Sequence, residues 1–150
     1  MSVGDFCNRE VVIATRNADI VLLAQLMREH HVGDIIVVDA AENGQNIPAG
    51  ILTDRDIVLE LIALEVPLDT VKAEDVMSRD LVLVREQDGL WDSLQLMQRK
   101  GVRRLVVVND KGGLEGILTV DDFLELLAEE LHSLSKIPFK GMAKERDIRD

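Results

Sequence analysis

The chain is short of cysteine, aromatic residues and long apolar runs, and each shortage excludes a class of protein. One cysteine, Cys7, cannot form an intramolecular disulfide, which suits a reducing compartment. Aromatic residues make up 3% of the 150 residues, so the core must be almost entirely aliphatic. No apolar run approaches the roughly 20 residues of a membrane span, and the first residues carry no basic and apolar leader. We therefore expect a soluble cytoplasmic protein.

Positive charge is also scarce. Lys and Arg number 17 against 28 Asp and Glu, for a net charge of −11. Nucleic acids and anionic lipid surfaces are bound mainly through Lys and Arg, so this balance opposes both partners. We expect no nucleic-acid partner and no membrane partner.

Sequence signatures of common enzymes are missing as well. The chain has neither Gly-x-x-x-x-Gly-Lys-Ser/Thr nor Gly-x-Gly-x-x-Gly. Cys7, His30, His31 and His132 do not have the spacing of a zinc site or of a nucleophile with its base. We expect no catalytic residues, no catalytic cofactor and no metal site. An enzyme on this scaffold stays as a minor alternative that a turnover assay with nucleotides would reveal.

What the chain does contain is an internal duplication. Residues 6–39 align with residues 76–109, and after a longer loop in the first copy Gly50-Ile51-Leu52-Thr53 repeats as Gly116-Ile117-Leu118-Thr119. Each copy has the pattern strand, helix, strand, strand, helix, which predicts an α/β (α+β) fold made of two similar units. The expected domains are residues 1–66, residues 67–135 and a charged tail at 136–150. The expected strands are 11–14, 35–39, 50–53, 81–84, 105–109 and 116–119, and the expected helices are 19–30, 54–64, 73–77, 88–100 and 120–134.

Each third strand ends in Thr-x-x-Asp at the start of a helix, as Thr53/Asp56 and Thr119/Asp122. Such a pair can be a capping box, in which the two side chains bond to the helix's first backbone groups. The same hydroxyl and carboxylate could instead face a ligand, because a carboxylate accepts hydrogen bonds from a sugar diol and a hydroxyl suits a phosphate. The two roles are compatible.

These features together resemble a tandem pair of cystathionine-β-synthase (CBS) domains, a Bateman module, over residues 3–132. The resemblance rests on the two Gly-Ile-Leu-Thr-x-x-Asp copies, Val76-Met77-Ser78 and the run at 102–109. It implies two repeats packed as a pseudo-two-fold pair, with clefts that bind AMP, ADP, ATP or S-adenosylmethionine. It also implies a regulatory module that does no chemistry and signals to a partner protein.

Carried over by residue, the resemblance favours the second copy as the better site. Asp122 would hold the ribose and Thr119 would lie at its phosphate edge. Arg103 and Arg104 stand at the position of the family's basic pair, and an arginine fork suits a phosphate. The alternative for the pair is a solvated strand start. Adjacent strand residues point to opposite faces, so one arginine would face the cleft, and the sequence leaves open which one.

The first copy departs from the pattern, since Gly33 and Asp34 stand where the second copy has the arginines. An acid there would repel a phosphate. Asp56 could still hold a ribose, and Arg55 could supply a charge if it turned inward. We expect the first site to be empty or to bind a nucleoside-like ligand weakly.

The sequence thus predicts a stand-alone, non-catalytic sensor of adenosine-containing ligands that forms a homodimer through its apolar helices and acts on an unknown effector protein. The alternative is a ligand-free dimerisation or interaction module. The phosphate number of the ligand, the partner and the dimer arrangement stay open.

Overall fold

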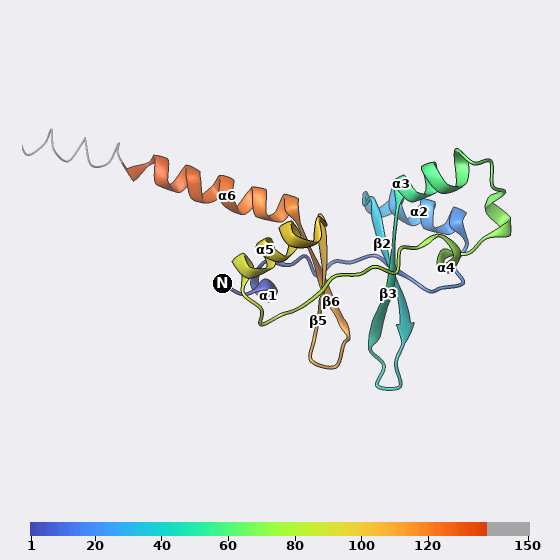
Figure 1. Cartoon of the computed structure of the whole chain (residues 1–150), viewed down its shortest axis with the longest axis horizontal. Coiled ribbons are helices and arrows are strands. Elements are labelled where there is room, and N and C mark those ends of the chain that lie inside the picture. Colours follow the sequence, from blue (N-terminus) through green and yellow to red (C-terminus); the bar gives the residue numbers. More distant parts are fainter. Residues whose placement is uncertain (138–150) are drawn as a thin grey trace, which may run out of the picture. The chain divides into compact units, whose positions relative to one another are not determined.

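The computed structural model describes residues 1–137 and falls into two units, Met1–Leu118 and Thr119–Asp150. The elements alternate as the duplication predicts (Figure 1). In chain order they are α1 (Val3–Phe6), β1 (Ile13–Ala14), α2 (Ile20–His30), β2 (Asp34–Ala40), β3 (Asn46–Thr53), α3 (Asp54–Asp56), η1 (Ile57–Ile62), η2 (Leu68–Thr70), α4 (Ala73–Val76), β4 (Leu83–Arg85), α5 (Leu90–Lys100), β5 (Arg104–Val108), β6 (Leu114–Thr119) and α6 (Val120–Ser135).

The strands form two three-stranded sheets, with the orders β1-β2-β3 and β4-β5-β6. In the first sheet β1 runs parallel to β2, and β2 runs antiparallel to β3; in the second sheet β4 runs parallel to β5. The mixed α/β class predicted from the repeat is therefore confirmed. The first strand of each repeat is shorter and later than predicted, because the apolar run at 11–14 bonds to β2 only at its end.

The closing helix of the first repeat differs from the single helix expected at 54–64. One α-helical turn, α3, passes into the π-helix η1, in which the Ala63 N–H donates to the Val58 carbonyl at 2.8 Å. Apolar spacing in so short a segment does not distinguish i+4 from i+5 bonding, so the sequence could not predict this change.

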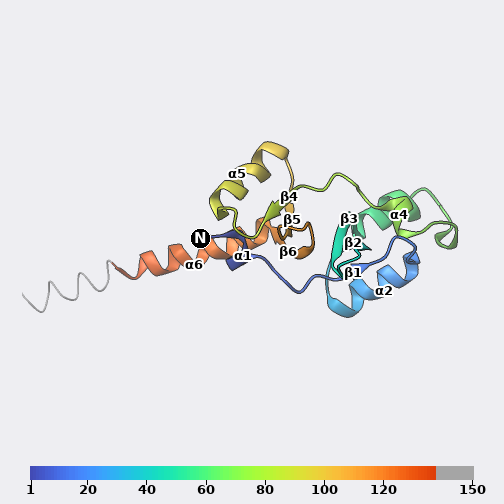
Figure 2. The ribbon, with the colours of Figure 1, turned by 90° about the horizontal axis from the view of Figure 1, so that it is seen from below.

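The segments that open the repeats are exchanged between the two sheets. Residues before β1 pair with the second repeat, where the Val3 and Gly4 N–H groups donate to the carbonyls of Asp88 and Glu86 at 2.9 Å each. α4 pairs with the first repeat, where the Ala73 N–H donates to the Ala18 carbonyl at 3.0 Å. Figure 2 shows α4 beside α2 and β3, and α1 far from them. The two repeats therefore depend on each other for part of their structure.

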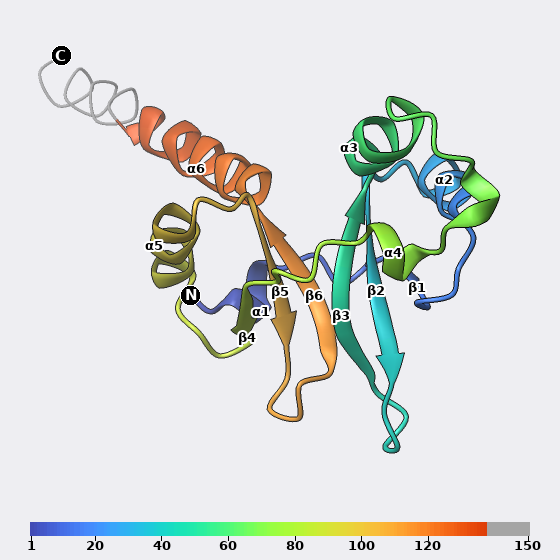
Figure 3. The same cartoon turned by 45° about the vertical axis from the view of Figure 1, so that its right-hand side comes forward.

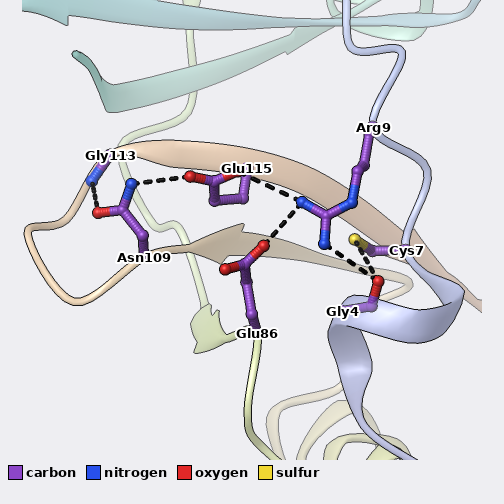
Figure 4. A network of polar contacts seen from close by, with 7 residues as sticks. All are labelled: Gly4, Cys7, Arg9, Glu86, Asn109, Gly113 and Glu115. Carbon is purple, nitrogen blue, oxygen red and sulfur yellow. Dashed lines mark hydrogen bonds and ion pairs between the residues drawn. The ribbon is translucent and has the colours of Figure 1, made fainter.

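Arg9 joins the exchanged N-terminal segment to the second repeat (Figure 4). Its Nη1 lies 2.7 Å from Glu86 Oε1 and 3.3 Å from Glu115 Oε2, and its Nη2 donates to the Gly4 carbonyl at 3.1 Å. Asn109 Nδ2 holds the other oxygen of Glu115 at 2.8 Å. The hydrogen bond to Glu86 raises the pKa of Arg9 above its ordinary value, in keeping with a guanidinium held among acids.

A glycine in the third strand of each repeat leaves room for the exchanged segment that crosses it. A Cβ on Gly50 would lie 2.5 Å from Met77 Sδ and 2.9 Å from the Ser78 carbonyl oxygen, and one on Gly116 would lie 2.7 Å from the Asn8 carbonyl oxygen. At both places the crossing segment pairs with the residue after the glycine, as Ile51 with Ser78 and Ile117 with Asn8. Gly-Ile-Leu-Thr therefore begins with glycine because a neighbouring chain passes directly over it.

Alternation along the strands separates two cores. Ile35, Val37 and Leu52 face the helices of the first repeat and belong to a core that includes Ile20 and Leu23. The intervening residues turn the other way, toward the second sheet, which lies alongside the first (Figure 3). They form a shared inter-sheet core. The buried members of that core are Ile36, Val38, Val106, Val108 and Ile117.

The second unit begins at Thr119 and contains α6, for which Thr119 is the N-cap residue. Leu124, Leu127, Leu131 and Leu134 on this helix are exposed. The expected tail at 136–150 lies outside the described residues from position 138 onward. Within residues 1–137, no helix combines the length and the apolar character that crossing a bilayer requires.

Candidate functional site

Both Thr-x-x-Asp copies form capping boxes, which confirms the structural role considered for them. The Thr53 N–H donates to Asp56 Oδ2 at 2.9 Å, and the Asp56 N–H donates to Thr53 Oγ1 at 3.1 Å. The corresponding distances for Thr119 and Asp122 are 2.8 and 3.3 Å. Each cap uses one carboxylate oxygen and the acceptor side of the hydroxyl. The hydroxyl proton and the second carboxylate oxygen therefore keep hydrogen-bonding capacity.

A pocket of about 220 Å³ lies at one end of the inter-sheet core, within the first unit. Its wall is mainly apolar, and its polar groups come from both repeats. Thr53 is contributed by the end of β3, Arg104 by the start of β5, Arg103 by the residue before it and Asp80 by the segment before β4. The apolar wall is made of Ile51, Leu81, Val82, Val102 and Val106.

Strand alternation explains why Thr53 and Arg104 meet there. Thr53 lies two residues after Ile51, and Arg104 lies two residues before Val106, so both side chains are on the faces that the sheets turn toward each other. Arg103 is exposed and also lines the pocket. Of the two arginines, Arg104 is the one whose side chain reaches across to the other sheet.

Arg104 finds an acidic partner in the first repeat. Its Nε lies 2.8 Å from Asp34 Oδ2, with 39% and 22% of the respective side chains exposed. Asp34 occupies the position in the first repeat that Arg104 occupies in the second, so corresponding residues of the two repeats form an ion pair. The sequence predicted repulsion of a phosphate by Asp34, but it gave no sign that this acid would bind the arginine of the other copy.

The pocket gives a grouping of predicted site residues that the sequence did not indicate. Arg103 and Arg104, which we predicted beside Thr119, line a pocket with Thr53 within the first unit. The reason is that the sheets face each other, so the start of β5 approaches the end of β3 from the opposite repeat. The threonine of the first Thr-x-x-Asp copy therefore shares a pocket with the basic pair, which the sequence did not indicate for this copy.

The other predicted residues are placed as follows. Asp56 is half-buried at the cap, and Arg55 is exposed; neither lines the pocket. Thr119 and Asp122 belong to the second unit, where the capping box is their described geometry. Among residues 1–137, no three His, Cys, Asp or Glu side chains are grouped to hold a metal ion.

Sequence reasoning missed the apolar wall and Asp80. Leu81 and Val82 were predicted in a strand and Val102 in the run at 102–109. No sequence signal indicated that these side chains would surround one pocket. The duplication could have indicated this grouping. In a pseudo-two-fold pair, the start of a strand in one repeat lies near the end of a strand in the other repeat.

A second charged cluster stabilises the first repeat away from the pocket. Arg16 Nε lies 2.7 Å from Asp39 Oδ1, and Arg16 Nη1 lies 4.0 Å from Glu74 Oε2 of α4. The hydrogen bond from Arg16 lowers the pKa of Asp39 below its ordinary value, and it raises the pKa of Arg16. This cluster supports the exchanged position of α4.

Comparisons with known proteins agree with this architecture. The family model of the CBS domain matches residues 3–63 and again residues 73–129. A CBS domain-containing protein of Bacillus subtilis, YhcV, is 38% identical over 121 residues, which cover 81% of each chain. An uncharacterised protein of Methanopyrus kandleri is 36% identical over 126 residues, covering 84% of this chain and 62% of that relative. The chain thus spans less than two thirds of the length of this second relative.

Among solved structures, the CBS domain pair of protein MJ0100, in complex with 5′-methylthioadenosine and S-adenosyl-L-methionine, superposes with a TM-score of 0.73 at 23% identity. The match covers 87% of this chain and 98% of that one. At this identity the likeness establishes the fold. With the family match over both repeats and the two facing sheets, it follows that the chain belongs to the CBS domain family and carries two CBS domains in tandem.

Proposed function

We propose that the chain is a non-catalytic sensor that binds an adenosine-containing ligand in the pocket at Thr53. The observation that carries the proposal is that one pocket is lined by three kinds of group: apolar side chains, a hydroxyl and two guanidinium groups. A nucleoside or nucleotide needs these three, since its base is flat and apolar on its faces, its sugar offers hydroxyls and its phosphate is anionic.

Five pocket residues have a proposed role. Ile51, Val82 and Val102 enclose the base, Thr53 donates its hydroxyl proton to the sugar or phosphate, and Arg103 approaches a phosphate from solvent. Asp56 lies outside the pocket wall, hydrogen-bonded to Thr53, and is proposed to accept from a ribose hydroxyl with Oδ1, because its cap bond uses Oδ2. Arg55 lies outside the pocket and we assign it no contact with the ligand.

Thr119 and Asp122 are proposed to hold a second ligand of the same class. They repeat the cap geometry of Thr53 and Asp56, with the same atoms bonded.

Signalling follows from the position of the pocket between two repeats. A ligand that contacts β3 and the start of β5 favours one arrangement of the sheets over others, by as much as its affinities for those arrangements differ. An effector protein that contacts both repeats would respond to that shift. The ligand-bound CBS pair of protein MJ0100 supports the ligand class, because its two ligands share an adenosine-derived part.

We further propose that two copies associate through apolar side chains of η1. Val58, Leu59 and Ile62 are 51%, 43% and 57% exposed on one short element, an unusual concentration for a surface in contact with water. Sedimentation velocity tests this proposal. Leu59→Glu should convert the dimer to a monomer, whereas Glu60→Gln on the same element should not; a wild-type monomer at all concentrations would contradict the proposal.

The ligand proposal is tested by thermal unfolding with adenosine, AMP, ADP, ATP and S-adenosylmethionine. At a hundred times Kd a ligand stabilises the folded state by about 2.7 kcal/mol, which for a chain of this length raises Tm by roughly 5–10 °C. Arg103→Ala should reduce the shift for a phosphate-bearing ligand, and Arg28→Ala, which removes a charge from an exposed site on α2, should not. Absence of a shift with every ligand, together with a stable dimer, would replace the sensor by an interaction module.

A further inference from the structure

We infer that Asp34 is a built-in counter-ion of Arg104, and that it restricts the pocket at Thr53 to ligands carrying little negative charge. The inference rests on the proposed function, because it names the ligand class of the same pocket. It begins from a contact between two residues at corresponding positions of the repeats, Asp34 and Arg104, whose Oδ2 and Nε are 2.8 Å apart.

The ion pair engages Arg104, the arginine whose side chain extends into the space between the sheets. A guanidinium binds a phosphate with two parallel hydrogen bonds, and the Asp34 carboxylate already uses the Nε–H of this fork. A ligand phosphate must therefore displace Asp34 or share Arg104 with it. In both cases the phosphate lies close to a carboxylate that repels it.

The charge balance of the pocket points the same way. Arg103 and Arg104 contribute two positive charges, and Asp34 and Asp80 contribute two negative charges at or beside the same space. The pocket as built is thus close to neutral. A nucleoside, or one with a single phosphate or a compensating positive charge, matches this balance, whereas a triphosphate brings several uncompensated charges.

The size of the pocket agrees with a small ligand. Its volume of about 220 Å³ is below the roughly 300–1,000 Å³ of typical ligand sites. It can enclose part of a nucleotide, but a triphosphate would extend beyond the walls toward the exposed Arg103. Of the two pocket arginines, Arg104 is the less exposed, and its Nε is already paired with Asp34.

Asp34→Asn tests the inference directly, because it removes the charge and keeps the shape. We expect the affinity for ATP to rise about tenfold, since one like charge near the phosphates is lost, while the affinity for adenosine changes by less than about twofold. The matched control is Asp69→Asn, which makes the same change of net charge at an exposed position on η2. Isothermal titration calorimetry at fixed ionic strength measures both ligands on the wild type and both variants.

Inorganic tripolyphosphate separates this inference from the proposed function, because it has no nucleoside. Asp34→Asn should strengthen its binding about tenfold, and adding Arg104→Gln should abolish the gain. If adenosine fails to bind any variant but tripolyphosphate responds in this way, the nucleoside proposal fails and the counter-ion inference stands. If adenosine binds but Asp34→Asn leaves ATP and tripolyphosphate at wild-type affinity, the inference is overturned and the sensor proposal survives.

Discussion

The exchange of opening segments between the repeats depends on Gly50, and replacing this glycine measures how much stability the exchange contributes. In Gly50→Ala the new Cβ would lie 2.5 Å from Met77 Sδ, 2.7 Å from Met77 Cγ and 2.9 Å from the Ser78 carbonyl oxygen. The thioether can rotate away, but the carbonyl is fixed by its bridge to Ile51. The strand or the crossing segment must therefore shift.

Overpacking of this kind costs about 1–3 kcal/mol. For a chain of this length that corresponds to a Tm lower by roughly 2–12 °C, or to an earlier midpoint in urea with an unchanged slope. Gly44→Ala is the control, because a Cβ at Gly44 would meet nothing within 4 Å. Its effect on stability therefore measures only the cost of placing alanine at a positive φ of 80°.

A double-mutant cycle identifies the cause. Met77→Ala removes the flexible part of the obstruction, so Gly50→Ala should cost less in that background than in the wild type, by roughly 0.5 kcal/mol or more. Gly44→Ala should cost the same in both backgrounds. A Gly50→Ala variant as stable as the wild type, or one whose effect simply adds to that of Met77→Ala, would refute the account of the crossing.

Three further outcomes are expected. Asp122→Ala removes a capping-box carboxylate and should cost about 0.5–2 kcal/mol by thermal unfolding, whereas Asp121→Ala, at the neighbouring position without the cap bond, should cost less. Leu52→Ala empties a fully buried position and should cost about 2–5 kcal/mol by urea unfolding. Arg16 lowers the pKa of Asp39 in the folded state, so the stabilisation by this ion pair is present above the unfolded pKa of Asp39 and is lost as pH falls through the folded pKa. Arg16→Gln should therefore flatten the wild-type loss of stability below about pH 4. An unchanged pH profile of stability would argue against the pair.

The repeat and its elements could be predicted from the sequence because they rest on local signals. Alternating apolar residues, the glycine before Ile51 and the Thr-x-x-Asp caps each act within a few residues. The elements predicted least well are those whose form depends on distant contacts. β1 is short because only its end pairs with β2, and η1 departs from the α-helix without any Pro or Gly in the segment.

The sequence predicted the residue types of the site, but not the grouping of Thr53 with Arg103 and Arg104. Thr53, Arg103 and Arg104 were all recognised, but the arginines were assigned to the Thr-x-x-Asp motif that follows them in the chain. Proximity in sequence favoured that assignment, which stays a prediction, and the facing of the two sheets brings the arginines close to Thr53 of the other repeat. The pairing of Asp34 with Arg104 is likewise a property of the assembled pair of repeats.

The central claim is that an adenosine-containing ligand binds in the pocket lined by Thr53, Arg103 and Val102. The most direct measurement is a titration of isotopically labelled protein with adenosine and AMP, followed through backbone amide and guanidinium signals. The account predicts that the largest shifts occur at Thr53, at 80–82 and at 102–104, with the Nε signal of Arg104 moving when AMP competes with Asp34. Saturable binding whose shifts fall elsewhere in the chain, with these signals unmoved, would contradict it.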